Sequence, residues 1–171
     1  EQPKRSHSIT RVHQFYTKRN LAVLAEVWNK AAPLNPLRFA LTKVATQLTK
    51  QYRFTYMNGC WGAGGGPMSG TLYIPSLFKE LPMAPFISKA IKYQSFRTTL
   101  KSGSVFISTQ STTNAKNIPV NSIDYIFTDP PFGGNLNYSE LSFLWESWLK
   151  VLTNQKTEAI VNEVQGKGLP E

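Results

Sequence analysis

Two consecutive prolines, Pro130 and Pro131, constrain this sequence more than any other local feature. Proline has no backbone N–H and restricts the residue before it, so the β-rich run at residues 123–128 must end there. Another β-rich run lies at residues 104–108, ahead of a polar loop. We therefore expect two short strands side by side in one sheet. Asp129 would lie at the carboxyl end of the second strand, where open α/β sheets bind ligands.

Apolar residues recur at helical spacing in residues 17–32, 35–48 and 141–152. We expect the first two segments to form an N-terminal helical hairpin. Asn137, three residues before Glu140, predicts a start resembling a capping box for the last helix. Further elements are expected as a strand at 52–57, an extended segment at 71–74 and short helices at 88–96 and 157–164.

The length and composition predict one domain. A chain of 171 residues with 41% hydrophobic content can bury one sizeable core. We expect that domain at residues 15–171, after a basic arm at residues 1–14. The sequence has no apolar run long enough to span a bilayer, and Glu1-Gln2-Pro3-Lys4-Arg5 resembles neither a translation start nor a secretory signal. These features predict a cytoplasmic fragment of a longer protein.

Cysteine and histidine are too few for common structural sites. Cys60 is the single cysteine and is expected to be buried or half-exposed, without an internal disulfide. His7 and His13 are the two histidines, and both lie in the polar arm. Since a structural zinc site needs about four nitrogen or sulfur ligands, no metal site is expected.

The net charge of +9 is unevenly distributed along the chain. Residues 1–101 hold 15 Lys and Arg against 3 acidic residues, a net charge of +12, whereas residues 102–171 hold 4 against 7, a net charge of −3. Lysine and arginine placed against phosphates release condensed counterions, so the basic part favours a polyanionic partner. A solvated basic surface without a partner explains the composition equally well.

The residues after the second β-rich run combine features that suit one kind of chemistry. Asp129 and a neighbouring carbonyl can both accept hydrogen bonds from a single NH₂ group, while Phe132 offers a face for stacking on a base. Gly133 and Gly134 permit close backbone approach. An exocyclic amine of a nucleobase is a poor nucleophile because its lone pair is delocalised into the ring. Two fixed acceptors favour the pyramidal amine, so the loop predicts methylation of such an amine.

Asp129-Pro130-Pro131-Phe132 resembles the Asp-Pro-Pro-Tyr/Phe motif of the N6-adenine and N4-cytosine DNA methyltransferases. The flanks at residues 15–21, 121–127, 137–141 and 148–149 also resemble site-specific DNA methylases. The resemblance implies a partial Rossmann-like, three-layer α/β fold. It also implies transfer of a methyl group from S-adenosylmethionine to DNA, with adenine N6 favoured over cytosine N4, as in restriction-modification systems.

The same resemblance assigns the site residues. It implies that Asp129, Pro130, Pro131 and Phe132 bind and activate the target base after it is flipped out of the duplex. The segment Thr109-Gln110-Ser111 is expected near the same pocket.

The sequence departs from the family at the cofactor site. The family binds S-adenosylmethionine through a Phe-x-Gly-x-Gly turn between a strand and a helix, and this sequence has no clear copy of it. The stretch from Gly62 to Gly66 is the one candidate, but Pro67 and an extended segment follow where a helix is expected. A loop is the favoured interpretation of this stretch, and the cofactor-binding residues stay unassigned. We expect the isolated fragment to be inactive.

Several alternatives remain at this stage. The substrate of the same chemistry could be RNA or a protein glutamine amide, although protein-glutamine enzymes carry Asn in place of Asp129. A basic nucleic-acid-binding domain without catalysis is a different class of function. Asp129-Pro130-Pro131 could also serve only as a turn that ends a strand. Outside the loop, we expect Trp145 and Trp148 in the core, and Glu140 and Glu146 on a solvated helix face.

Overall fold

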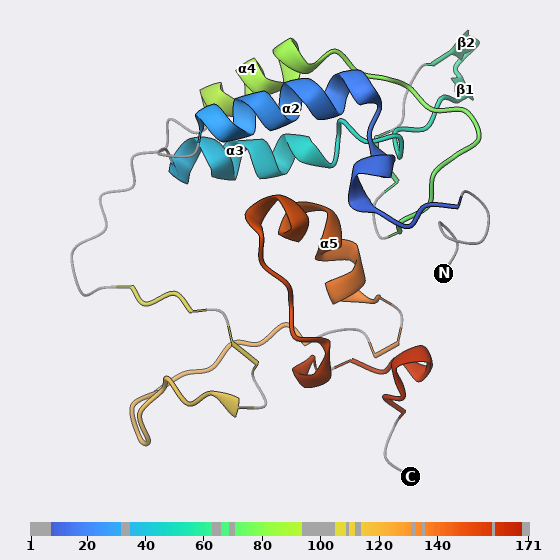
Figure 1. Ribbon diagram of the computed structural model, residues 1–171. Helices are drawn as coiled ribbons and strands as arrows, with labels where there is room; N and C mark the ends of the chain where they lie inside the picture. The colour runs from blue at the N-terminus through green and yellow to red at the C-terminus, as the bar shows by residue number, and fades with distance from the viewer. Residues whose placement is uncertain are drawn as a thin grey trace. The chain divides into compact units, whose positions relative to one another are not determined.

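The structure is a computed structural model that describes residues 8–31, 35–62, 66–68, 71–93, 105–108, 110–111, 114–130, 133–134, 136–158 and 160–168. The chain divides into two compact units (Figure 1). The first unit comprises Glu1–Arg97 and Leu141–Leu152, and the second comprises Thr98–Glu140 and Thr153–Glu171. The single domain expected over residues 15–171 stays a prediction, as does the Rossmann-like fold.

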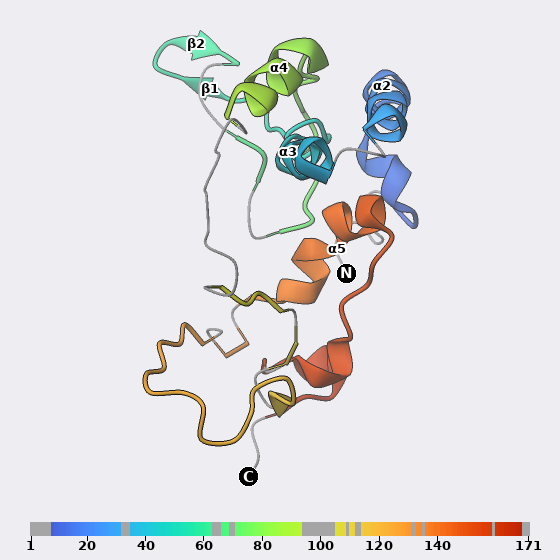
Figure 2. The same ribbon diagram turned by 90° about the vertical axis from the view of Figure 1, so that its left-hand side faces the viewer.

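Three helices form the body of the first unit: α2 (Lys18–Lys30), α3 (Asn35–Ala45) and α4 (Met83–Tyr93). They lie side by side in Figures 1 and 2, and each contacts the other two. The two expected N-terminal helices are thereby confirmed. The third begins before the predicted segment at 88–96. None of the helices in the described ranges is long and apolar enough to cross a membrane.

Residues 15–21, which resemble a segment of DNA methylases, have structural roles in this unit. Thr17 caps α2, and its hydroxyl oxygen accepts a hydrogen bond from the Asn20 N–H at 3.2 Å. The buried Asn20 amide donates to the carbonyls of Leu48 and Leu81 at 3.2 and 3.3 Å. This side chain therefore joins α2 to two distant stretches of backbone and satisfies both of its donors.

The core of the first unit lies between these helices and receives one side of α5 (Tyr138–Leu149), whose predicted position is confirmed. Trp148 packs edge-on against Tyr16 and lies 5.5 Å, between ring centroids, from Trp28. Its expected core position is confirmed in part, because the side chain is half-buried and packs against the core. Glu146 is buried as well, which corrects the expected solvated position and shows that α5 is covered on more than its Leu144 side. The buried apolar residues are Phe15, Tyr16, Leu24, Trp28, Ala31, Ala40, Leu41, Val44, Ala45, Leu48, Ile74, Met83, Ala90 and Leu144.

Burial raises the pKa of the Tyr16 hydroxyl from 10.0 to about 12, although the Trp148 indole N–H donates to this oxygen at 3.0 Å and lowers it in part. Since the folded pKa lies above the unfolded one, the contribution to stability is complete below about pH 10 and is lost as the pH rises through about 12. The shift corresponds to about 3 kcal/mol of folding free energy.

In urea unfolding at pH 8 and 11, Tyr16→Phe should lose less stability with rising pH than the wild type. The exposed Tyr125→Phe should follow the wild type, and equal losses in all three proteins would contradict the assignment.

The expected strand at 52–57 is only partly formed. A short antiparallel hairpin pairs β1 (Tyr56–Met57) with β2 (Cys60–Trp61). Its turn residues Asn58 and Gly59 have positive φ angles of 52° and 75°, as a two-residue hairpin turn requires. Tyr52 and Arg53 form only isolated bridges, because the segments opposite them are short and irregular. Cys60 lies on this hairpin and is exposed, which corrects the expectation of burial.

The arm expected at residues 1–14 is ordered in its second part. Val12–Phe15 form a 3-10 helix, and the half-buried Ile9 and Val12 pack against the core. Burial of these two apolar side chains lowers the free energy of the folded chain, which favours packing of this part of the arm over a solvated arm. Residues 1–7, including His7, lie outside the described residues.

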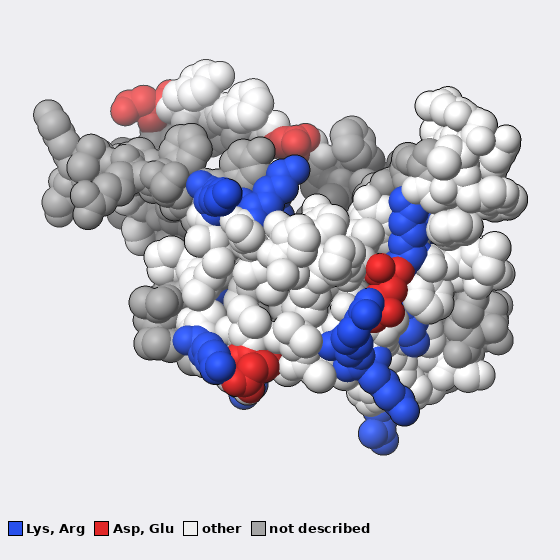
Figure 3. Space-filling model, turned by 90° about the horizontal axis from the view of Figure 1, so that it is seen from above, with Lys and Arg blue, Asp and Glu red and all other residues white. Residues whose placement is uncertain are grey.

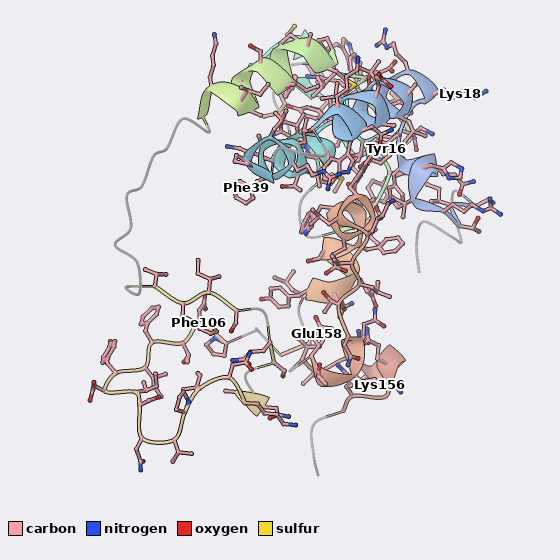
Figure 4. The ribbon with its side chains drawn as sticks, turned by 60° about the vertical axis from the view of Figure 1, so that its left-hand side comes forward. Tyr16, Lys18, Phe39, Phe106, Lys156 and Glu158 are labelled. Carbon is pink, nitrogen blue, oxygen red and sulfur yellow. The ribbon has the colours of Figure 1, made fainter. Side chains whose placement is uncertain are left out.

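The two β-rich runs of the second unit are not in strands. Residues 105–108 and 123–128 are extended or bent without ladder hydrogen bonds. Phe106, labelled in Figure 4, is 76% exposed, and Phe127 is 84% exposed. This outcome corrects the two predicted strands. Strand propensity alone does not hold a segment in a sheet, because its backbone groups need a paired neighbour, and neither run pairs with any described residue.

Candidate functional site

The predicted catalytic loop lies in the second unit, and its first half is described. Asp129 and Pro130 are both exposed, so the Asp129 carboxylate is open to a ligand. Among the described residues, 123–130 form no hydrogen bond with one another or with other segments. Pro131 and Phe132 lie outside the described residues. The chain therefore presents a carboxylate whose acceptor oxygens are not already engaged by described groups.

The glycines that follow the loop are fixed by a segment near the C-terminal end. Gly133 has a φ of +53°, in the left-handed region that favours glycine, and its carbonyl accepts a hydrogen bond from the Val161 N–H at 3.2 Å. A Cβ placed on Gly134 would lie 3.1 Å from the Val161 carbonyl oxygen. A side chain at residue 134 would thus have to shift the Val161 carbonyl by a few tenths of an ångström, which favours glycine at this close approach.

Helix α5 begins shortly after these glycines, and Glu158 caps its first turn. The Glu158 carboxylate accepts from the Ser139 N–H at 2.8 Å and from the Ser139 hydroxyl at 2.7 Å. A carboxylate at this position also suits the positive end of the helix dipole. The expected capping box is corrected, because Asn137 and Glu140 instead accept hydrogen bonds from the side chains of Asn162 and Gln165, at 3.0 and 3.3 Å.

The C-terminal segment has its own compact structure. In place of the expected helix at 157–164, the described residues form two 3-10 turns, Gln155–Thr157 and Glu163–Gln165. Asn162 pairs with Lys167 through two backbone hydrogen bonds of 2.8 and 2.9 Å, and Gly166 closes the turn in the left-handed region. The Lys167 ammonium donates to the carbonyl of Glu158 at 2.8 Å, and to that of Gln155. Figure 4 labels Lys156 and Glu158 in this segment.

The segment expected near the pocket is only partly described. The Ser111 hydroxyl donates to the Thr157 carbonyl at 2.8 Å, and Gln110 is half-buried. Thr109 lies outside the described residues. The structure therefore joins Ser111 to the C-terminal segment.

Of the glycine-rich stretch at residues 62–66, the structure describes Gly62 and Gly66, and the Gly62 amide is not available to a cofactor. Gly62 has a φ of +75°, and its N–H donates to the Thr55 carbonyl at 2.7 Å, so this amide is already used to close the hairpin. A Cβ on Gly62 would lie 3.0 Å from the Phe54 ring. Residues 63–65 lie outside the described residues. No cluster of three or more metal-ligating side chains occurs in the described part of the chain either.

The basic residues of the first unit form separate groups on its surface (Figure 3). Two of them have acidic partners: Arg19 Nε lies 3.2 Å from Glu80, and Lys30 lies 3.1 Å from Glu26. Exposed ion pairs of this kind contribute little to stability, about 0–1 kcal/mol each. On the face that Figure 3 shows, the described basic side chains are thus distributed rather than concentrated in a single patch.

Sequence reasoning did not identify Glu158, Val161 and Asn162 as neighbours of the loop. No local pattern marks them, because their contacts with residues 133–139 depend on how a distant segment folds back. The hairpin turn at Asn58-Gly59 did have a recognisable signal, since Asn-Gly is the preferred pair for such turns. Comparison of the chain with protein-family models, curated proteins and solved structures found no match.

Proposed function

We propose that this chain carries the amine-binding loop of a site-specific DNA methyltransferase, which transfers a methyl group from S-adenosylmethionine to an exocyclic amine of a DNA base. Adenine N6 is favoured over cytosine N4. The observation that carries the proposal is the exposed carboxylate of Asp129, followed by two prolines, an aromatic residue and two glycines. The resemblance of this loop and its flanks to the amino-methyltransferases supports the assignment, and Asp129, Pro130, Pro131 and Phe132 are its proposed site residues.

The proposed role of the loop follows from the chemistry of its groups. An NH₂ group of a base offers two donors, and the Asp129 carboxylate together with a carbonyl of the rigid Pro130-Pro131 backbone offers acceptors for both. Held in this way, the amine loses conjugation with the ring and its lone pair becomes available. The carboxylate also stabilises the positive charge that develops on the nitrogen as the new bond to carbon forms. Stacking of the base on Phe132 would offset part of the free energy of base flipping.

The proposal is confined to the amine side of the reaction. The Gly62 amide is engaged within the hairpin, so it is not assigned to binding of S-adenosylmethionine. No step through the cofactor is therefore assigned to residues of this chain.

The proposal is tested by the product that the protein forms. The natural protein that contains this sequence would be incubated with duplex DNA and S-adenosylmethionine carrying a labelled methyl group, and the DNA would be hydrolysed to nucleosides. We expect the label in N6-methyldeoxyadenosine. Parallel reactions with RNA and with a glutamine-containing peptide test the alternative substrates. DNA binding without transfer to any of them would favour a non-catalytic nucleic-acid-binding domain, to which the basic first part of the chain is suited.

A further inference from the structure

We propose that Glu158, Val161 and Asn162 form a positioning clamp for the amine-binding loop, with Asn162 as its central side chain. This inference rests on the proposed function, and it adds residues that do not touch the substrate. It starts from an asymmetry in the second unit. Residues 123–130, which lead into the loop, form no hydrogen bond with described residues, whereas the residues that follow the loop are held at several points.

Three points of attachment define the clamp, and together they connect two short stretches of chain. The Val161 N–H donates to the Gly133 carbonyl at 3.2 Å. The Asn162 side chain donates to Asn137 Oδ1 at 3.0 Å. The Glu158 carboxylate accepts from the backbone and the hydroxyl of Ser139, at 2.8 and 2.7 Å. Gly133, Asn137 and Ser139, which lie between the loop and the first turn of α5, are thus each held by one residue of the C-terminal segment.

Asn162 connects the clamp to Gln165 and Lys167, which hold the clamp residue itself in place. Its side chain is buried, and its Oδ1 accepts from the Gln165 N–H at 3.2 Å while its Nδ2 donates to Asn137. Its backbone pairs with Lys167. Loss of the amide would leave Asn137 and the Gln165 N–H without these partners in a partly buried place, which destabilises the arrangement. Val161, the residue that touches both glycines, is its immediate neighbour.

Asp129 lies four positions before Gly133 in the sequence, so the clamp can act on it through a short stretch of backbone. Gly133 is the fixed end, and the two prolines before it restrict the backbone that leads back to Asp129. A catalytic acceptor must be held near its productive position, since a displacement of about 1 Å can reduce a rate by on the order of 10²-fold. The downstream clamp is the part of the described chain that can supply this restraint.

The test compares Asn162→Leu with Asn162→Asp in the natural protein. Asp keeps an acceptor for the Gln165 N–H, and the amide of Asn137 can turn to donate to it, whereas Leu replaces neither hydrogen bond. We expect Asn162→Leu to accelerate hydrogen exchange in residues 127–140 and to lower kcat for methyl transfer by about 10- to 100-fold, with KM for DNA nearly unchanged. Asn162→Asp should retain kcat within about threefold. Asn117→Leu, at an exposed position of the same unit, is the matched control and should change neither quantity.

A second variant reaches the clamp without touching Asn162. Gly134→Ala places a Cβ 3.1 Å from the Val161 carbonyl and should accelerate exchange in the same peptide. Unchanged exchange in both Asn162→Leu and Gly134→Ala would overturn the clamp, as would acceleration that extends equally to α2. Accelerated exchange in a protein whose wild type transfers no methyl group would leave the clamp standing and refute the proposed function.

Discussion

Asp129→Ala is expected to reduce methyl transfer by on the order of 10²- to 10³-fold or more, while DNA binding stays nearly intact. The carboxylate is the proposed acceptor for the amine and the group that stabilises its developing charge. Because Asp129 is exposed and forms no hydrogen bond with described residues, its removal should not disturb folding. Single-turnover rates with saturating DNA, together with DNA affinity measured separately, would distinguish a loss of chemistry from a loss of binding.

Asp124→Ala is the matched control for this experiment. Asp124 is an exposed aspartate in the same β-rich run, ahead of the loop, and the resemblance assigns it no role. The Asp124→Ala variant should transfer methyl groups at the wild-type rate. Asp129→Asn keeps one acceptor oxygen and removes the charge, so its rate should lie between those of the wild type and Asp129→Ala. Turnover of Asp129→Ala close to that of the wild type would remove the basis of the proposed function.

Leu41→Ala is expected to lower the free energy of unfolding by about 2–5 kcal/mol. Leu41 lies on α3 with 0% exposure, in the core that α3 shares with its neighbouring helices. Truncation removes buried methyl groups and leaves a cavity that packed helices fill only in part. Urea unfolding followed by circular dichroism gives the difference, and an unchanged slope against urea would show that the same surface is exposed on unfolding.

Phe39→Ala on the same helix is the control for that loss. Phe39 is 68% exposed, and Figure 4 labels it beside α3. Its truncation should change the free energy of unfolding by no more than about 0.5 kcal/mol. Equal losses in the free energy of unfolding for Leu41→Ala and Phe39→Ala would contradict the assignment of Leu41 to the buried face of α3 and of Phe39 to its exposed face.

The helices could be predicted from the sequence because their information is local. The apolar spacing of Leu21, Leu24 and Trp28 determines which side of α2 is buried, and Thr17 supplies its cap. The same reasoning placed α5 and the core position of Trp148. A turn also needs only neighbouring residues, so Asn58-Gly59 carried enough information to predict the hairpin.

The prediction of the two strands was wrong because strand formation depends on residues distant in the sequence. Residues 105–108 and 123–128 have the composition of strands, but a strand exists only where another segment supplies hydrogen-bond partners. The prediction of the cap of α5 was wrong for a related reason. Asn137 and Glu140 have the right spacing, yet Glu158 accepts from the first turn because a distant segment brings its carboxylate there.

The candidate chemistry could be recognised in the sequence without a fold, because Asp129, the two prolines and the glycines lie close together in the chain. The contacts of the residues that follow the loop come from the tertiary structure alone. Val161, Asn162 and Glu158 reach residues 133–139 through hydrogen bonds between segments about 20 to 30 residues apart, in contacts that no local pattern encodes. The tertiary structure also decided that the Gly62 amide closes a hairpin, because its acceptor, the Thr55 carbonyl, lies opposite it only when that hairpin forms.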